Sequence, residues 1–448
     1  MSTKTQNIEF FLLLVFSIVL VTILPSFFDI IEPDSLGYIN NSISRKNLYP
    51  FVLDVFDVTE TKNHKLIKLF QILILCLSIV LLIETCRKVK IICHTRILLY
   101  ILIFFNIYYV SFSKTILTES LFFSFINFSI AVMFNIFFNN KNQFLLLGLC
   151  LGFILAIKSI GLILFGTFLL SILVFKTTTK KNLIGLFLGI SIFPIIELCY
   201  QKNKNLNESH NTIILRSILG KVFIISGKEN FDTSRFEKEK IEFLDKLREE
   251  SIEINKYLSK IKNPYLYLDL IADYEVLGQY QVIELNKENE SQIKEIFLEI
   301  LKQYPLDYIK ISLSHYLGLW LPGSKRIFLN DYSDNRELIK MPNKLKLDMV
   351  AGNILELPTL LLLANLIFFN IIFIVFSLCT FFTIKRILRF RANIFDLLVI
   401  SIQLYLLSVA FLNVSTPRYF MAIYPLTLVI LAIRVEKRLI KKSFEFFS

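Results

Sequence analysis

The stretch EFFLLLVFSIVLVTILPSFFDIIEPDSLGYINNSISRKNLYP, residues 9–50, decides the fold of this chain. Its first half is an apolar run long enough to cross a bilayer as a helix, and its second half is an acid-rich segment with Glu32 and Asp34. Carboxylates held just outside a bilayer are costly to place and usually serve a task. We therefore expect a spanning helix over 8–28, and Asp34 is the candidate for the chemistry.

The rest of the chain repeats this apolar pattern. Of its 448 residues 54% are hydrophobic and 44 are Phe, and the mean hydropathy is +0.60. Such repeated apolar runs are typical of transmembrane helices, and the strict alternation of a membrane barrel is absent, so we predict an all-α polytopic membrane protein with about ten transmembrane helices. The expected spans are 8–28, 66–84, 97–112, 119–138, 143–157, 160–175, 182–198, 353–378, 394–412 and 419–434.

Basic residues gather in alternate short loops, and this asymmetry predicts the orientation. With the N-terminus inside, the short outer loops are far poorer in Lys and Arg than the inner loops and the C-terminal tail. The inner groups are Arg87, Lys88, Lys90, Arg96, Lys141, Lys176, Lys180, Lys181, Lys385, Arg386, Arg389, Arg391, Arg434, Lys437, Arg438, Lys441 and Lys442. We expect both termini in the cytoplasm and a bacterial cytoplasmic membrane as the location.

This orientation divides the chain into three parts. Residues 1–198 are an N-terminal transmembrane module whose first outer loop, 29–65, is the expected catalytic loop. Residues 199–352 are a large outer loop, and 353–448 are a C-terminal transmembrane module. The polar groups of both modules that face outward could meet with the large loop at one membrane surface, which is how active sites are assembled.

The large outer loop has the pattern of amphipathic helices. Residues 235–260 are a charged helical stretch, and 290–303 place apolar residues at helical spacing. Residues 212–226 and 307–321 are more apolar, and either fits an interfacial helix that lies on the bilayer. The loop is large enough to cover a cavity at the level of the membrane surface.

Composition excludes several classes of function. The net charge of +12 follows from the basic loops, and no basic stripe with interleaved aromatics favours nucleic-acid binding. The six cysteines are scattered, and the four histidines have no zinc-ligand spacing. We expect no metal and no cofactor.

Three short stretches carry a family resemblance. They are EPDSLGYINNSISRKNLYP at 32–50, TILTESLFF at 115–123 and TPRYFMAIYPL at 416–426. In this order, and all at the outer surface, they resemble the GT-C fold of polyprenyl-phosphate-sugar-dependent glycosyltransferases. That group includes the protein O-mannosyltransferases and the bacterial lipid A aminoarabinose transferases. The large loop matches nothing in that pattern.

The resemblance implies a role for the acids of the first loop. Transfer of a sugar needs a base that takes the proton of the acceptor hydroxyl as it attacks the anomeric carbon. Similarity to the family assigns this role to Asp34, with Glu32 as the rival, and the alternative is that both acids cap the following helix. The family often has two adjacent acids here, whereas Pro33 separates these two. A metal held by an acid pair is therefore not expected.

Cations are expected to meet the phosphate that leaves the sugar. Arg418, Arg45, Lys158 and Lys114 lie on the predicted outer face, and Tyr419 follows Arg418 in the motif. For each cation the alternative is an interfacial side chain that reaches the headgroups, and for Lys114 we favour that alternative.

The remaining candidates have open roles. Glu119 could bind substrate, pair with a lysine or cap its helix. Tyr38 could hydrogen-bond a sugar or phosphate, and Tyr49 more readily shapes the loop. His315 could contact the acceptor or lipid, and Trp320 is better read as an interfacial anchor.

The sequence thus predicts an inverting membrane glycosyltransferase, related to hexosyltransferases. Its expected partners are a polyprenyl-phosphate sugar donor, membrane lipids, and a glycan, lipid or protein acceptor. One alternative is an O-antigen-type polymerase, for which Arg216 and Arg235 of the large loop are available. The other is a lipid or solute transporter, although the internal repeat typical of that class is not visible.

Overall fold

A computed structural model of the chain describes residues 3–24, 26, 28–40, 46–139, 141–175, 179–204, 212–281, 290–321, 357–413, 416 and 418–446. Every regular element within these ranges is a helix. This agrees with the predicted all-α class, because a chain in hydrocarbon satisfies its backbone groups most simply within each helix.

The chain divides into two compact units. Unit 1 comprises Met1–Glu208, Ile372–Tyr405 and Phe420–Ser448, and unit 2 comprises Ser209–Ile371 and Leu406–Tyr419. The predicted transmembrane modules lie mostly in unit 1, and the predicted large outer loop lies mostly in unit 2.

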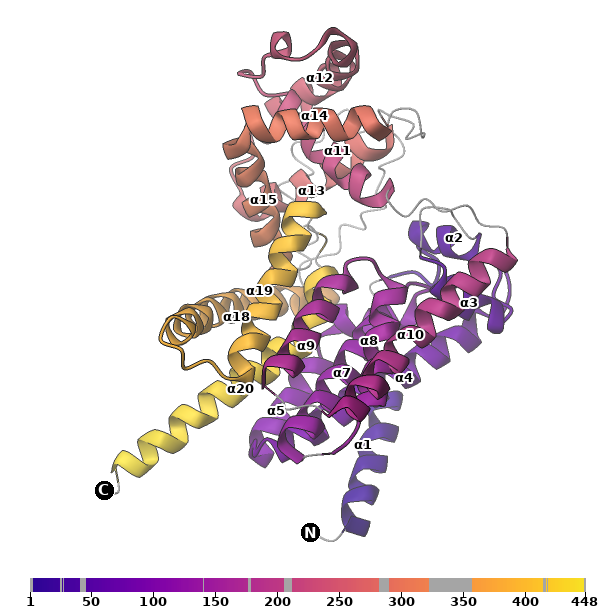
Figure 1. The fold of residues 1–448 in the computed structure, drawn as a ribbon, viewed down its shortest axis with the longest axis vertical. Helices are drawn as coiled ribbons and strands as arrows, with labels where there is room; N and C mark the ends of the chain where they lie inside the picture. Colours follow the sequence, from indigo (N-terminus) through magenta and orange to yellow (C-terminus); the bar gives the residue numbers. More distant parts are fainter. Residues whose placement is uncertain are drawn as a thin grey trace. The chain divides into compact units, whose positions relative to one another are not determined.

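Unit 1 is built on a set of apolar helices (Figure 1). Among them α4 packs against α7, α7 against α8, and α8 against α10. Two short helices, α2 and α3, lie between α1 and α4 in the chain. The elements are α1 (Thr3–Ile23), α2 (Pro33–Ile39), α3 (Leu48–Val55), α4 (His64–Lys88), α5 (Cys93–Phe104), α6 (Ile107–Ser111), η1 (Phe112–Lys114), α7 (Glu119–Asn139), α8 (Phe144–Ile157), α9 (Gly161–Phe175) and α10 (Lys180–Asn203). Later in the chain come α18 (Leu357–Ile387), α19 (Ile394–Leu412) and α20 (Arg418–Phe446), of which the parts within Ile372–Tyr405 and Phe420–Ser448 belong to unit 1.

Helices lie at all ten predicted positions, but ten membrane crossings are not established. In the described ranges six helices are long and apolar enough to cross a bilayer: α4, α7, α10, α18, α19 and α20. The predicted span 97–112 is instead a pair, α5 and α6 with η1, bent by 58°. The bend falls where Asn106 caps α6 by accepting from the Tyr109 N–H at 3.1 Å.

Three predicted spans are shorter than a bilayer normally needs. The apolar parts of α1, α8 and α9 have 10–17 residues each. Helix α1 ends at Ile23 rather than at residue 28, because Pro25 disfavours helical geometry in the residue before it. The chain is therefore a multi-pass α-helical membrane protein, and its described part contains six helices long enough to cross, or seven if the bent pair is one span.

Helices α8 and α10 approach each other unusually closely. A Cβ added to Gly148 would lie 2.2 Å from the carbonyl oxygen of Leu186, and one added to Gly152 would lie 2.4 Å from that of Ile190. A Cβ added to Gly189 would likewise lie 2.4 Å from the carbonyl oxygen of Leu145. Small residues spaced by four allow such contact between helices in a membrane.

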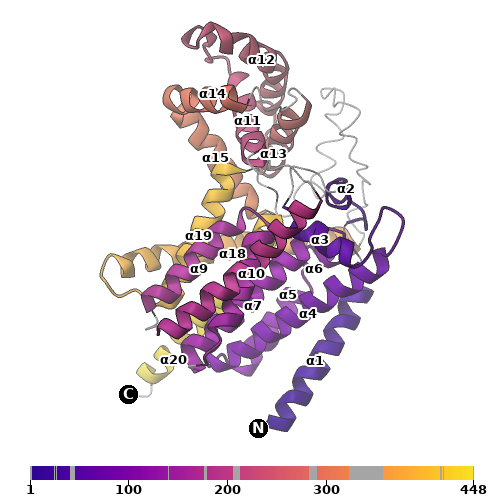
Figure 2. The ribbon, with the colours of Figure 1, turned by 45° about the vertical axis from the view of Figure 1, so that its right-hand side comes forward.

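Unit 2 has a core of its own around α11 (Figure 2). Helix α11 (Thr212–Ser226) packs against α12 (Lys238–Leu258), α13 (Pro264–Gln281), α14 (Glu290–Gln303) and α15 (Pro305–Leu319), and η2 (Thr233–Arg235) precedes α12. The described apolar side chains of α11, from Ile218 to Ile225, are buried in this core. The prediction of an interfacial helix over 212–226 is wrong, because the described side chains 218–226 are buried among four other helices.

Helix α15 fits the interfacial pattern better. Its inner face contributes Tyr308 and Ile311 to the core of unit 2. Its other face exposes large apolar side chains at helical spacing, namely Leu306, Ile309, Leu313 and Leu317. One buried face and one exposed apolar face are what a helix on a lipid surface needs.

Candidate functional site

Helix α2 lies within the predicted catalytic loop. Glu32 precedes it, and the carboxylate of Glu32 accepts from the Asp29 N–H at 3.0 Å. The Ser35 hydroxyl accepts from the Glu32 N–H at 2.9 Å, so side chains satisfy the backbone groups at the start of this helix. The Glu32 side chain therefore has a structural role at the start of α2. Asp34 lies in the first turn, half-buried, where the helix dipole favours a carboxylate.

The face of α2 that carries Asp34 also carries Tyr38, because residues four apart lie one above the other on a helix. Tyr38 is 5% exposed, and its hydroxyl lies 3.4 Å from the Thr118 Oγ1. Thr118 immediately precedes α7. Helix α2 is therefore joined to the start of α7 by a buried polar contact.

Behind Thr118 lies a buried ion pair. Thr118 Oγ1 donates to Glu119 Oε2 at 3.2 Å, and Lys158 Nζ lies 2.6 Å from Glu119 Oε1. Glu119 is 1% exposed, and Lys158 also lies over the ring of Phe122 at 5.7 Å. We call Tyr38, Thr118, Glu119 and Lys158 the polar chain.

The polar chain joins elements that are far apart in the sequence. It links α2, the start of α7 and the end of α8 at one end of unit 1. An ion pair is costly to bury in an apolar bundle, so its presence at this end requires a reason beyond stability.

A second hydrogen-bonded set holds the surrounding segments. The Tyr49 hydroxyl donates to Gln71 Oε1 at 3.0 Å, and Gln71 Nε2 donates to the Thr115 carbonyl oxygen at 2.9 Å. Burial raises the pKa of Tyr49 well above its usual value, so its hydroxyl keeps the proton that it donates. The ring of Tyr49 packs edge-on against Tyr38 at 5.2 Å. These contacts tie α3, α4 and the approach to α7 together.

Lys114 has a structural role. Its ammonium group donates to the carbonyl of Leu24, just after the end of α1. The Ile116 N–H donates to the Ile30 carbonyl oxygen at 2.9 Å, so the segment before α2 is also attached to the segment before α7. This attachment fixes where α2 begins.

A polar cavity of about 590 Å³ lies beside the C-terminal end of α2. Within it Asp54 accepts from the Tyr200 hydroxyl at 2.8 Å and pairs with Lys204 at 2.9 Å. Its lining residues are Ile39, Asn40, Asp54, Asp57, Val58, Thr59, Glu60, Thr61 and Lys204. The size is that of a small-molecule site, and carboxylates, hydroxyls and an amide are groups that can bind a polyhydroxylated ligand.

His315 belongs to a separate buried cluster in unit 2. Its Nε2 lies 2.6 Å from Glu275 Oε1, and Lys221 Nζ lies 3.4 Å from Glu275 Oε2. All three side chains are fully buried. Burial lowers the pKa of His315 and of Lys221. Burial by itself would raise the pKa of Glu275, but attraction to His315 and Lys221 holds it below its usual value.

The same cluster reaches the segment that carries Arg418. Lys221 Nζ donates to the Asn413 carbonyl oxygen at 2.8 Å, and Asn413 Nδ2 donates to the Tyr419 hydroxyl at 2.7 Å. The guanidinium of Arg418 lies over the Tyr419 ring at 5.7 Å, and its Nε donates to Thr416 Oγ1 at 3.2 Å. Unit 2 therefore positions Arg418 through a continuous run of contacts.

The predicted site residues thus fall into three groups. Asp34, Tyr38, Glu119 and Lys158 gather at one end of unit 1, where Glu32 caps α2. Arg418, Tyr419 and His315 belong to the connected set of unit 2. Arg45 lies outside the described residues.

Sequence reasoning missed several members of these clusters. Thr118 and Gln71 connect the first-loop residues, and Glu275 and Lys221 surround His315. Lys221 had a signal, since it interrupts an apolar helical stretch, but nothing local pointed to Glu275 as its partner. Among the described residues no three His, Cys, Asp or Glu side chains are grouped to hold a metal ion.

Comparison of the chain with models of protein families, with curated proteins and with solved structures finds no match.

Proposed function

We propose that this chain is a membrane glycosyltransferase that moves one sugar from a polyprenyl-phosphate carrier to a glycolipid, surface polysaccharide or protein. The reaction takes place at the outer face of a bacterial cytoplasmic membrane, with both termini in the cytoplasm. The observation that supports this proposal best is that Asp34 lies one helical turn from Tyr38, which belongs to the buried polar chain at one end of an apolar helical unit.

Asp34 acts as the base. The acceptor hydroxyl attacks the anomeric carbon, its proton passes to the Asp34 carboxylate, and the bond from that carbon to the phosphate oxygen breaks. Polyprenyl phosphate leaves with the electron pair of that bond. A half-buried carboxylate on a helix whose start is fixed by Glu32 and Ser35 supports this role, because a base must be held within hydrogen-bond reach.

The polar chain positions the substrate and the base. Lys158 is neutralised by Glu119, so the pair contributes fixed dipoles rather than a free cation. Tyr38, whose hydroxyl lies near Thr118, offers a donor one turn from Asp34. The resemblance of residues 416–426 to the family is what supports Arg418 as the cation for the leaving phosphate. The polar cavity beside the C-terminal end of α2 has room for part of the acceptor.

The test is sugar transfer by the purified protein in detergent, with a panel of radiolabelled polyprenyl-phosphate sugars and envelope extract as acceptor. Asp34→Asn should lower the rate by about 10²–10⁴-fold, the usual contribution of a general base, while the donor still binds. Glu32→Gln is the matched control, because it changes a carboxylate two residues away that serves the helix start. It should keep most of the activity.

Equal rates in Asp34→Asn and in the unmodified protein would contradict the proposed role of Asp34. Growth of polymer from diphosphate-linked repeat units, without use of any carrier sugar, would instead indicate a polymerase. A folded protein that catalyses neither reaction would favour a transporter.

A further inference from the structure

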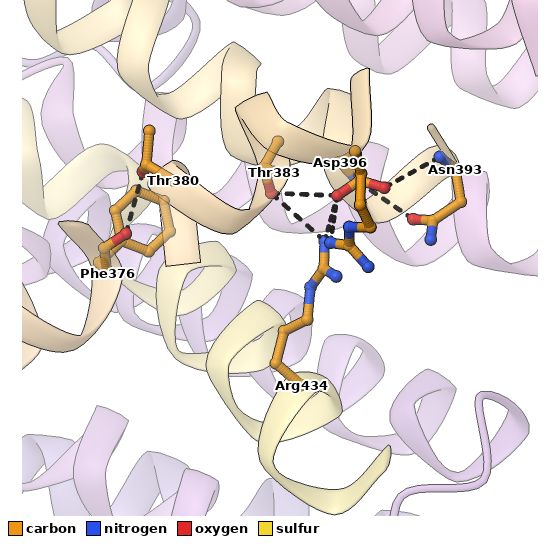
Figure 3. A network of polar contacts seen from close by, with 7 residues as sticks. Phe376, Thr380, Thr383, Asn393, Asp396 and Arg434 are labelled. Atoms are coloured by element: carbon orange, nitrogen blue, oxygen red, sulfur yellow. Dashed lines mark hydrogen bonds and ion pairs between the residues drawn. The ribbon is translucent and has the colours of Figure 1, made fainter. Parts of the chain in front are cut away.

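One carboxylate joins three helices at the end of unit 1 that is opposite to α2. Asp396, the third residue of α19, is fully buried. Figure 3 shows its carboxylate among Thr383, Asn393 and Arg434. Its Oδ1 accepts from Arg434 of α20 at 2.5 Å and from Thr383 of α18 at 3.0 Å, and it also pairs with Arg386. Its Oδ2 accepts from the Asn393 N–H at 3.0 Å. Two guanidinium groups share one carboxylate, so this cluster keeps a net positive charge.

Other basic turns of unit 1 lie at the same end. Glu436, two residues after Arg434, accepts from the Ile92 N–H at 3.1 Å, which attaches the turn between α4 and α5 to α20. Phe138, near the end of α7, stacks on Phe395 at 5.6 Å. The acids here, Glu84, Asp396 and Glu436, are each already bound by a cation or a backbone N–H. Basic side chains therefore dominate this end.

The turn between α18 and α19 has an unusual surface. Leu388 is 74% exposed and Phe390 is 99% exposed, and the basic residues Arg389 and Arg391 alternate with them. Phe390 has φ of 53°, a left-handed geometry that normally favours glycine. The turn holds a large aromatic side chain out of the protein, in a strained backbone geometry, between two arginines.

We propose that this turn is a binding surface for anionic phospholipids. In a membrane protein the ends of the spanning helices lie at the level of the lipid headgroups. Arg389 and Arg391 then contact headgroup phosphates, and Phe390 and Leu388 insert at the boundary between headgroups and acyl chains. Asp396 keeps the three helix ends together beneath the turn. The proposal is independent of the glycosyltransferase reaction.

An anionic lipid is favoured over a zwitterionic one by the charge of the surface. Each basic residue near an anionic membrane surface contributes about fivefold in binding, so two contribute on the order of thirtyfold. The apolar side chains do not discriminate between headgroups. Charge should therefore set the lipid preference, and Phe390 should set the overall retention of lipid.

The experiment is native mass spectrometry of the detergent-purified chain, mixed with equal amounts of phosphatidylglycerol and phosphatidylcholine. The unmodified protein should retain phosphatidylglycerol in preference. Arg389→Gln with Arg391→Gln should lower that preference by on the order of thirtyfold. Phe390→Gly should lower retention of both lipids while its thermal midpoint is unchanged or higher, because glycine relieves the left-handed geometry.

The matched control is Lys62→Gln with Lys65→Gln, two exposed lysines at the opposite end of unit 1. This pair should leave the preference unchanged. The proposal would be overturned if the arginine variant kept its preference for phosphatidylglycerol over phosphatidylcholine. It would also be overturned if the lysine variant lost as much of that preference as the arginine variant does.

Discussion

Glu119 and Lys158 form an ion pair that is largely removed from water, with the Lys158 side chain 15% exposed. Glu119 is 1% exposed, and its partner lies 2.6 Å away at the end of another helix. A pair of this kind offsets its own desolvation only while both members are present. Replacing one member leaves a buried charge, whereas replacing both leaves none.

We therefore expect Lys158→Met to destabilise unit 1 by about 3–5 kcal/mol, the usual effect of breaking a buried pair. Glu119→Gln combined with Lys158→Met should recover most of that loss. Thermal unfolding in detergent of the unmodified protein, the two single variants and the double variant measures the cycle. Recovery of stability without recovery of sugar transfer would separate the role of the pair in the reaction from its role in folding. If the double variant were as unstable as Lys158→Met, the charge of the pair would not be the cause.

The cluster of His315, Glu275 and Lys221 makes the stability of unit 2 depend on pH. The pKa of each group is lowered in the folded state, so the folded state binds fewer protons than the unfolded state. Stability then increases with pH. For His315 the contribution is complete above its ordinary value of 6.5 and is lost as pH falls below it.

We expect unit 2 to unfold more easily at pH 5 than at pH 8, with a slope of at most about 1.4 kcal/mol per pH unit for each proton bound. Hydrogen exchange of the amides of α11, α13 and α15 measures this. His315→Gln should flatten the dependence below pH 6.5, because glutamine does not titrate. An unchanged slope in that variant would assign the proton uptake to other groups.

At the scale of elements, the packing of α8 on α10 depends on glycines. Gly148 and Gly152 on α8 face α10, and Gly189 on α10 faces α8. A Cβ added to any of the three would lie within 2.4 Å of a backbone carbonyl oxygen of the other helix. The contacted atoms belong to the backbone and have little freedom to move. Gly185 differs, since a Cβ there would meet the Leu145 nitrogen at an ordinary 3.7 Å.

Gly152→Ala should therefore destabilise the protein by about 1–3 kcal/mol, as overpacking does. Gly185→Ala is the matched control on the facing helix and should be neutral or slightly stabilising, because alanine is the better helix former. The thermal midpoints of the two variants in one detergent provide the comparison. Equal midpoints would show that α8 and α10 do not pack this closely.

At the scale of the whole molecule, two native cysteines can test the orientation. Cys93 begins α5 and Cys199 lies near the end of α10, and both are exposed. The basic loops predict that Cys93 faces the cytoplasm and Cys199 the outside. Cys76, Cys86 and Cys150 are buried and should not react.

We expect a membrane-impermeant maleimide to modify Cys199 in intact cells and to modify Cys93 only after permeabilisation. Variants that keep one of these two cysteines, with the others changed to serine, identify the site by mass. Labelling of Cys93 in intact cells would reverse the orientation and place the Asp34 end of unit 1 in the cytoplasm.

The positions of the helices were predictable from the sequence, although their ends and the number of crossings were not. Apolar runs and helical spacing are local properties, and they located α7, α14 and α19 almost to the residue. The break between α5 and α6 was missed because it depends on the Asn106 cap, which is one side chain in a long apolar run. Candidate acids and bases could be selected from the sequence, because charged residues beside apolar spans are conspicuous, and their roles stay a prediction.

By itself the sequence determined an all-helical, multi-pass membrane protein, because an apolar segment in a bilayer must satisfy its backbone within its own helix. Only the tertiary structure decided which polar groups meet. Tyr38 contacts Thr118 across 80 positions, and Lys158 contacts Glu119 across 39. Such pairs depend on how helices pack and on where their ends lie, and no local pattern encodes that. The same holds for Glu32 and Asp34, which look equivalent in the sequence until the start of α2 assigns one of them to the cap.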